Sequence, residues 1–183
     1  MSKIGRKPID VSKLQVEVKG PEVHYKGSKL SGVYEIPQEL AVRVEDKKLS
    51  LEPAKGIGAK KRDINRVWGL HRALLANALN GAVSDFEKKV EIKGLGYKAV
   101  KSGKKLVLSL GYSHKIDFDM PEGVTVDIDK TGQNLTFKSP NREMVGLVCS
   151  RLRDLRSPEP YKGTGIRLAD EVVARKAGKA KAA

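Results

Sequence analysis

The sequence predicts an α+β fold made of two tandem similar domains, each an antiparallel sheet with one packed helix, followed by a basic C-terminal tail. Runs of alternating apolar and polar residues are typical of half-buried strands. Each group of such runs is followed by one amphipathic helix pattern, and this order occurs twice along the 183 residues. A chain of this length can hold one ordinary domain or two small ones.

The first half predicts a set of short strands followed by a helix. The alternating segments are residues 14–18, 23–26, 33–36, 40–44 and 48–52. From Ile64 the apolar residues follow helical spacing, with Val67, Trp68, Leu75 and Leu79 on one stripe. The Asn80-Gly81 pair predicts the end of this helix, and its apolar face should pack on the sheet.

The second half repeats the pattern. Strands are predicted at residues 89–93, 97–100, 105–110, 115–119, 124–128 and 134–138, and a helix follows with Met144, Val148, Leu152 and Leu155 on its apolar face. Residues 36–53 match residues 120–140, and residues 16–20 match residues 90–94. An ordered set of matches indicates a duplication. We therefore predict domains at residues 1–82 and 83–183, with the tail beginning at about residue 157.

Charge suggests the class of partner. The chain has 36 Lys and Arg residues against 22 Asp and Glu residues, a formal charge of +14 and a pI of about 9.8. Such an excess attracts polyanions, and nucleic acid is the first candidate. A merely soluble basic protein would have the same charge. The apolar stretches are too short for a membrane span, and neither a secretion signal nor a lipidation motif is present. We expect a cytoplasmic protein without a membrane partner.

Residues suited to catalysis or metal binding are few. The sequence contains three His residues and one Cys residue, and they are scattered along the chain. We expect His71, on the apolar helix face, to have a structural role and Cys149 to lie in the core. The G-x-G-x-x-A run at residues 94–99 resembles a dinucleotide-binding turn, but a strand pattern follows where that motif requires a helix. We therefore predict no enzyme activity, no catalytic residue, no metal, no cofactor and no small-molecule substrate.

Several segments carry a family resemblance. They are SKIGRKPI (2–9), HRALLANALNGA (71–82), FEKKVEIKGLGYKA (86–99), LVLSLGYSH (106–114) and SPEPYKGTGIRLADEVVARKAGK (157–179). Together they resemble the bacterial large-subunit ribosomal protein L-six family almost from end to end. The last segment is the most specific, because its composition is unusual and its length excludes chance. The sequence departs from the family at Lys115, where a proline usually follows the histidine.

The resemblance implies a structural constituent of the large ribosomal subunit. Its expected partner is large-subunit (23S) rRNA near the stalk base and the factor-binding region, where it would stabilise rRNA architecture. Neighbouring ribosomal proteins would contact it, and elongation factors would lie close by. The alternative is a free-standing RNA-binding regulator or a ribosome assembly factor of the same fold.

The candidate rRNA-binding residues form three groups. The N-terminal group is Lys3, Arg6 and Lys7, for which a loose solvated arm is the alternative. The second group lies around the start of the first helix, where the helix dipole is unfavourable for cations unless an anion binds there; it contains Lys60, Lys61, Arg62 and Arg66. The third group lies in the C-terminal segment and contains Pro158, Tyr161, Lys162, Gly163, Gly165, Arg167, Arg175 and Lys176.

The C-terminal group combines features that suit RNA. Pro158 limits the entropy lost on docking. Gly163 and Gly165 would let main-chain N–H groups approach phosphate oxygens. Tyr161 would stack on a base or sugar, although it could also pack on its own domain. The cationic side chains would contact phosphates.

Overall fold

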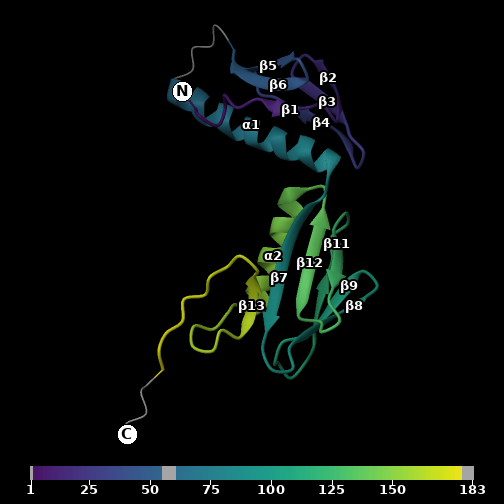
Figure 1. Cartoon of the computed structure of the whole chain (residues 1–183), viewed down its shortest axis with the longest axis vertical. Helices are drawn as coiled ribbons and strands as arrows, with labels where there is room; N and C mark the ends of the chain where they lie inside the picture. The colour runs from purple at the N-terminus through teal and green to yellow at the C-terminus, as the bar shows by residue number, and fades with distance from the viewer. Residues whose placement is uncertain (1, 55–60, 179–183) are drawn as a thin grey trace. The chain divides into compact units, whose positions relative to one another are not determined.

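The computed structural model describes residues 2–54 and 61–178, apart from the side chains of residues 61 and 62. The chain divides into two compact units, Met1–Asp85 and Phe86–Ala183, each built from antiparallel strands and one helix (Figure 1). This arrangement confirms the predicted α+β class. Each unit contains two small sheets rather than one.

Unit 1 contains helix α1 (Lys61–Val83) and six strands in its described part. The strands are β1 (Ile9–Asp10), β2 (Gln15–Lys19), β3 (Glu22–Lys26), β4 (Ser31–Glu35), β5 (Leu40–Glu45) and β6 (Lys48–Pro53). They form one three-stranded sheet in the order β1-β6-β5 and another in the order β2-β3-β4. The alternating segments of the sequence therefore form the predicted strands, and the two-residue β1 is the one that the pattern missed.

The core of unit 1 lies between α1 and both sheets. Leu75 and Leu79 of α1 pack with Leu49 and Leu51 of β6, and all of them are at most 1% exposed. Trp68 belongs to the same cluster, and its indole N–H donates to the carbonyl of Leu51 at 2.7 Å. The predicted apolar stripe is thus the packed face of the helix.

The end of α1 differs from the prediction. The helix passes through Asn80-Gly81 and ends at Val83. The turn between β3 and β4 caps it, since the Lys29 N–H donates to the carbonyl of Ala82 at 2.9 Å and the Ser28 hydroxyl donates to that of Val83 at 3.0 Å. The predicted stop at Gly81 was wrong because these tertiary hydrogen bonds satisfy the last carbonyls further along the chain.

Unit 2 contains helix α2 (Arg142–Leu155) and seven strands in its described part. The strands are β7 (Phe86–Lys93), β8 (Lys98–Ser102), β9 (Lys105–Ser109), β10 (Ile116–Asp119), β11 (Thr125–Ile128), β12 (Asn134–Ser139) and β13 (Gly165–Leu168). The sheets have the orders β11-β12-β7-β13 and β10-β9-β8. Asn141 caps α2 by accepting the Glu143 N–H at 3.0 Å, which satisfies one of the free donors of its first turn.

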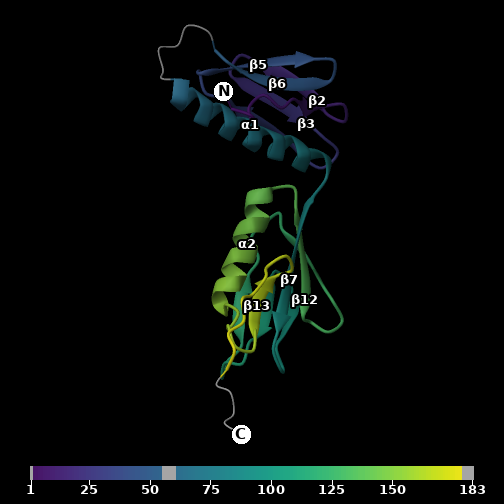
Figure 2. The ribbon, with the colours of Figure 1, turned by 60° about the vertical axis from the view of Figure 1, so that its left-hand side comes forward.

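Strand β13 lies inside the segment from residue 157 onward, for which the sequence predicts a basic tail. It pairs with β7 in antiparallel register, with Ile166 opposite Ile92, and Ile166 is 0% exposed. Figure 2 shows β13 beside β7, with α2 covering the sheet. The pattern missed this strand because it forms by pairing with the distant β7, and it lies inside a segment rich in Gly, Pro and charged residues.

The topology supports the duplication and corrects one of the two sequence matches. The sheet β1-β6-β5 corresponds to β7-β12-β11, and β2-β3-β4 corresponds to β8-β9-β10. The matched residues 36–53 and 120–140 indeed contain equivalent hairpins. The match of residues 16–20 with 90–94 was wrong, because it pairs β2 with β7 instead of β8. The true equivalents are the turns at Gly20 and Gly103, which both have φ of 61°.

Candidate RNA interface

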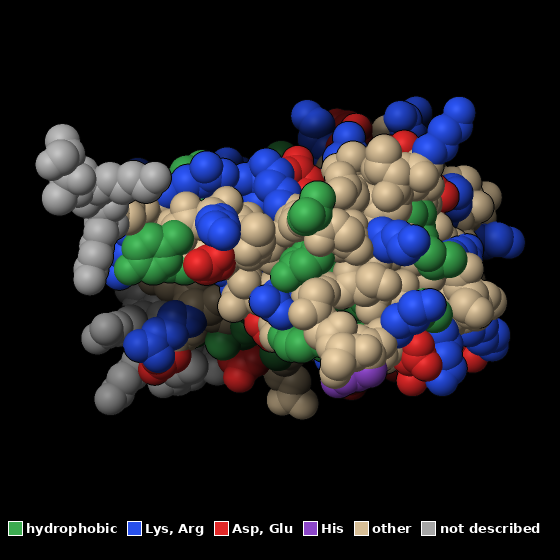
Figure 3. All heavy atoms as spheres, turned by 90° about the horizontal axis from the view of Figure 1, so that it is seen from below, with side chains coloured by type: hydrophobic (Ala, Val, Ile, Leu, Met, Phe, Trp, Pro, Cys, Tyr) green, Lys and Arg blue, Asp and Glu red, His purple; other side chains and the backbone are tan. Residues whose placement is uncertain are grey.

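One end of unit 2 gathers several loops. Strand β7, strand β9 and helix α2 all end there, so the loops 94–97, 110–115 and 156–164 lie close to one another, together with the turn 129–133. Figure 3 views the molecule from below and shows many Lys and Arg side chains with apolar side chains between them. A cationic surface with apolar groups is suited to nucleic acid.

An arginine between two tyrosines lies at this loop end. The Arg156 guanidinium carbon is 5.7 Å from the ring centroid of Tyr97 and 4.7 Å from that of Tyr112. The Tyr112 hydroxyl donates to the carbonyl of Leu155 at 3.1 Å, and its ring stacks on His114 with centroids 6.2 Å apart. Tyr112 is nonetheless 45% exposed. The cluster therefore offers aromatic faces and a positive charge to one partner.

Two glycines hold the Tyr97 ring in place. A Cβ atom added to Gly94 would lie 2.6 Å from that ring, and one added to Gly111 would lie 2.8 Å from it. Strand β8 follows the glycine run, as the sequence analysis expected. Gly94 of the dinucleotide-like run therefore serves ring packing, whereas Gly96, with φ of 73°, has open space beside it.

The loop 157–164 is closed by its own hydrogen bonds. The Glu159 N–H donates to the carbonyl of Thr164 at 2.9 Å, the Gly163 N–H donates to that of Glu159 at 2.9 Å, and the Thr164 hydroxyl reaches the Glu159 carboxylate at 3.2 Å. Tyr161 is 55% exposed, and Lys162 is also exposed, while Pro158 is half-buried. The loop thus presents Tyr161 and Lys162 to solvent from a preformed turn.

The glycines of this loop have a reason within the chain. Gly163 has φ of 70°, and its N–H is already bonded to Glu159. Gly165 has φ of 140°, and a Cβ there would lie 2.7 Å from the Ser157 carbonyl oxygen. The interpretation that these glycines serve mainly to admit phosphate needs revision, because loop geometry alone requires them.

The predicted cations of the C-terminal segment differ in their surroundings. The Arg167 side chain is 23% exposed and donates to the Glu91 carboxylate at 3.0 and 2.6 Å. Arg175 and Lys176 are exposed, and the Lys176 N–H donates to the carbonyl of Pro160 at 2.9 Å. Arg175 and Lys176 therefore lie beside the loop that presents Lys162, whereas the charge of Arg167 is compensated within the sheet.

In unit 1 the N-terminal arm is an ordered turn. Lys3, Arg6 and Lys7 are exposed on it. Gly5 packs so closely on Trp68 that an added Cβ would lie 2.5 Å from the indole. Arg72 of α1 donates to the carbonyl of Lys7 at 3.0 Å. These contacts hold the cations of the arm against the helix and do not fit a loose arm.

The group around the start of α1 is described only in part. Lys60 lies outside the described residues, and so do the side chains of Lys61 and Arg62. The Arg66 side chain is 69% exposed and lies 3.5 Å from the Asp63 carboxylate, a pair that contributes little to stability at such exposure.

The remaining candidate groups have structural roles. His71 Nδ1 lies 2.9 Å from the Tyr34 hydroxyl, as expected for a histidine fixed by a hydrogen bond. Cys149 is 0% exposed, and burial raises the pKa of its thiol to about 11, so it remains protonated. Over residues 2–54 and 61–178, no group of His, Cys, Asp and Glu side chains could hold a metal ion. Neither described helix is long and apolar enough to cross a membrane.

Comparison with known proteins gives the family. The family model described as "Ribosomal protein L6" matches residues 93–168. The large ribosomal subunit protein uL6 of Methylobacterium nodulans is 39% identical over 182 residues, covering 99% of this chain and 100% of the relative. The uL6 protein of Methylacidiphilum infernorum is 41% identical, covering 98% of this chain and 98% of the relative. That of Rhodopseudomonas palustris is also 41% identical, covering 99% of this chain and 100% of the relative. The chain belongs to the family of large ribosomal subunit protein uL6.

Proposed function

We propose that the protein binds large-subunit rRNA at the loop end of unit 2 and so stabilises the architecture of that RNA. Membership of the uL6 family makes the chain a structural protein of the large ribosomal subunit and not an enzyme. Similarity over almost the full length of the relatives favours a ribosomal constituent over a free-standing regulator or assembly factor.

The observation that carries the RNA contact is the placement of Arg156 between Tyr97 and Tyr112. Folded RNA hides most base edges in a deep groove, so proteins contact its phosphates, 2′-hydroxyls and splayed bases. Tyr112 and Tyr161 are exposed enough to stack on such bases. Lys162, Arg175 and Lys176 lie beside them and would contact phosphates.

A second contact would form on unit 1. The N-terminal arm presents Lys3, Arg6 and Lys7 from a turn that Trp68 and Arg72 hold. Because the arm is fixed before binding, little entropy is lost when its cations meet phosphates.

The location in the subunit follows from the family resemblance. We place the binding site near the stalk base and the factor-binding region of the 23S rRNA. Neighbouring ribosomal proteins would surround it there, and elongation factors would pass close to it.

Crosslinking of the assembled large subunit with mass readout tests this proposal. Short-wavelength irradiation should join Tyr112 or Tyr161 to rRNA nucleotides, with further crosslinks from the N-terminal arm. Crosslinks confined to the outer face of the sheet β2-β3-β4, with none from the loop end of unit 2, would contradict it.

A further inference from the structure

Unit 2 contains a groove between the edge strands of its two sheets. Strand β8 is the outer strand of one sheet and β11 is the outer strand of the other. Two adjoining cavities of about 600 and about 390 Å³ lie along these strands and share Lys101 and Val126 in their lining. Both volumes fall within the range of roughly 300–1,000 Å³ that is usual for ligand sites.

The backbone of β8 turns unpaired groups toward this groove. Ser102 and Lys105 flank a two-residue turn, so they form a hydrogen-bonded pair. In an antiparallel pair every second residue is bonded to the neighbouring strand, so Val100 and Lys98 are the next residues of β8 bonded to β9. By this alternation Ala99 and Lys101 direct their N–H and C=O groups away from β9. The Ala99 N–H indeed donates to the carbonyl of Gly132 at 2.8 Å.

The backbone of β11 does the same from the opposite side. The Asp129 N–H donates to the carbonyl of Asn134 at 3.0 Å, so the next residue bonded to β12 is Asp127, opposite Thr136. Val126 and Ile128 therefore direct their N–H and C=O groups toward the groove. Gly132 lies in the turn between β11 and β12. Among the described residues, the bond from Ala99 to Gly132 is the one backbone hydrogen bond between β8 and this β11–β12 hairpin.

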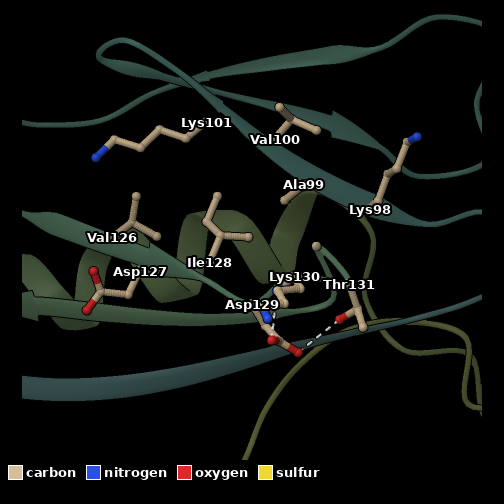
Figure 4. Close-up of a pocket in the computed structure, with 11 residues that line it drawn as sticks. Lys98, Ala99, Val100, Lys101, Val126, Asp127, Ile128, Asp129, Lys130 and Thr131 are labelled. Carbon is tan, nitrogen blue, oxygen red and sulfur yellow. Dashed lines mark hydrogen bonds between the residues drawn. The ribbon is translucent and has the colours of Figure 1, made fainter.

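The side chains of the groove are apolar in the middle. Figure 4 shows Val126 and Ile128 directed from β11 toward β8, and Ala99 directed from β8 toward β11. Ala99 is 2% exposed and Val126 is 6% exposed, whereas Val100 is 53% exposed. Ala99 and Val126 belong to the core of the unit, so the half-buried Val124 and Ile128 are the apolar side chains that an occupant would contact.

The charges along the groove favour an anionic occupant. The lining lysines Lys98, Lys101 and Lys130 form no ion pair with the described residues. Of the lining carboxylates, Asp127 and Glu122 are paired with lysines, whereas Asp129 only accepts hydrogen bonds and offsets one of the three lysine charges. Asp127 lies 3.1 Å from Lys138, and Asp129 accepts from the N–H of Lys130 at 2.7 Å and from the Thr131 hydroxyl at 3.1 Å.

We propose that this groove binds an extended acidic segment of a partner protein, which pairs with the open edges of β8 and β11. Unpaired edges template the addition of a strand, and the alternating N–H and C=O groups of a peptide match them. An RNA backbone has acceptors but no such alternating donors, and it has no apolar face for Val124 and Ile128. The proposal goes beyond rRNA binding, which uses the loop end of the unit.

A heptapeptide provides the probe. Acetyl-Glu-Val-Glu-Ile-Glu-Val-Glu-amide is titrated into the ¹⁵N-labelled full chain, and the amide signals of Lys101, Val126 and Ile128 are expected to shift most. Two further peptides have the same sequence but carry methyl groups on backbone nitrogens. In one peptide the nitrogens of Val and Ile are methylated, and in the other those of the Glu residues. Loss of the donors that face one edge should weaken binding about tenfold, as expected for one or two hydrogen bonds. Equal binding of all three peptides would overturn the proposal.

Variants of the protein test whether the N–H groups and charges of β8 contribute to peptide binding. Lys101→Ala removes one charge, whereas Lys101→Pro also removes an N–H that faces the groove, at an edge position where proline is tolerated. We expect Lys101→Ala to weaken binding about threefold and Lys101→Pro about tenfold further, with circular dichroism as the check on folding. Lys13→Ala in unit 1 should bind like the parent chain. If hexauridylate displaces the heptapeptide and causes the same amide shifts, the groove is an RNA contact and the proposal is wrong.

Discussion

Tyr112 illustrates how a single residue can serve both packing and binding. Its hydroxyl is bonded to the carbonyl of Leu155, and one side of its ring is covered by Arg156, yet 45% of the residue is exposed. Tyr112→Ala should lower rRNA affinity by about fivefold to a hundredfold, because a stacked base contributes on the order of 1–3 kcal/mol. Tyr112→Phe keeps the ring and should bind within about threefold of the parent chain. Filter binding at one salt concentration, with folding verified by circular dichroism, measures both. Equal affinity of Tyr112→Ala and the parent chain would remove Tyr112 from the interface.

Two glycines with positive φ, one between β10 and β11 and one at the start of β13, allow backbone strain to be separated from steric clash. Gly123 and Gly165 both have positive φ, of 80° and 140°, but only Gly165 would place a Cβ against backbone, 2.7 Å from the Ser157 carbonyl oxygen. Gly123→Ala should therefore reduce the free energy of unfolding by about 1 kcal/mol, and Gly165→Ala by roughly 1–3 kcal/mol more. Urea denaturation of the two variants provides the comparison. Equal losses would show that the loop relaxes to admit the methyl group.

Of the residues proposed to bind rRNA, only those that are neighbours in the sequence could be recognised from it. Tyr161 and Lys162 lie in one compositionally unusual segment, so the resemblance identified them together. Tyr97, Tyr112 and Arg156 come from three loops that only the folded sheets bring together, and no spacing rule connects them. A signal was present in the Gly-x-Gly-Tyr and Gly-Tyr runs at residues 94–97 and 111–112, because a glycine beside an aromatic residue often admits a ring.

At the scale of elements, periodicity predicted what local packing determines. Strands with one apolar face were found in the sequence, as was the apolar stripe of α1 with Trp68, Leu75 and Leu79. Elements that form only against a segment distant in the sequence were not predicted. The last turn of α1 forms because Ser28 and Lys29 cap it, and β13 forms because the edge of β7 is open to it.

An ion pair helps to hold the segment after β13. Arg153 of α2 donates to the Glu171 carboxylate at 2.6 and 2.9 Å, and this hydrogen bonding is the main reason that the pKa of Glu171 lies below its usual value of 4.5. A lowered carboxyl pKa contributes stability that is present above about pH 4.5 and is lost as the pH falls through the folded-state value.

Glu171→Gln tests this contribution. We expect it to reduce the free energy of unfolding of unit 2 by about 1 kcal/mol at pH 7, since the pair is only partly exposed. The difference from the parent chain should shrink as the pH falls below 4.5. Thermal unfolding at pH 7 and at pH 3 measures both quantities, with Glu159→Gln, whose carboxylate accepts the hydroxyl of Thr164 within the loop, as a local comparison. A difference that does not change with pH would contradict the assignment to the carboxylate charge.

At the scale of the whole molecule, charge and fold have separate roles. The net charge of +14 draws the chain to polyanions, but it does not say which face binds. The fold distributes this charge: Arg167 is neutralised by Glu91 within a sheet, whereas Lys162 and Lys176 remain exposed beside the loop end. Binding therefore depends on the position of a cation as well as on the total.

Salt dependence of rRNA affinity distinguishes these two roles. Lys162→Ala and Lys19→Ala each remove one positive charge, but Lys19 lies on β2 of unit 1, 3.4 Å from the Glu17 carboxylate. If Lys162 contacts a phosphate, its loss should reduce the slope of log K against log salt concentration by about 1, because one fewer counterion is released. Lys19→Ala should leave the slope unchanged, since Lys19 already pairs with Glu17 and belongs to neither proposed RNA contact. Fluorescence anisotropy with an rRNA fragment between 50 and 200 mM salt gives both slopes. An equal reduction of the slope for the two variants would mean that total charge alone governs binding. It would contradict the assignment of phosphate binding to the loop end of unit 2.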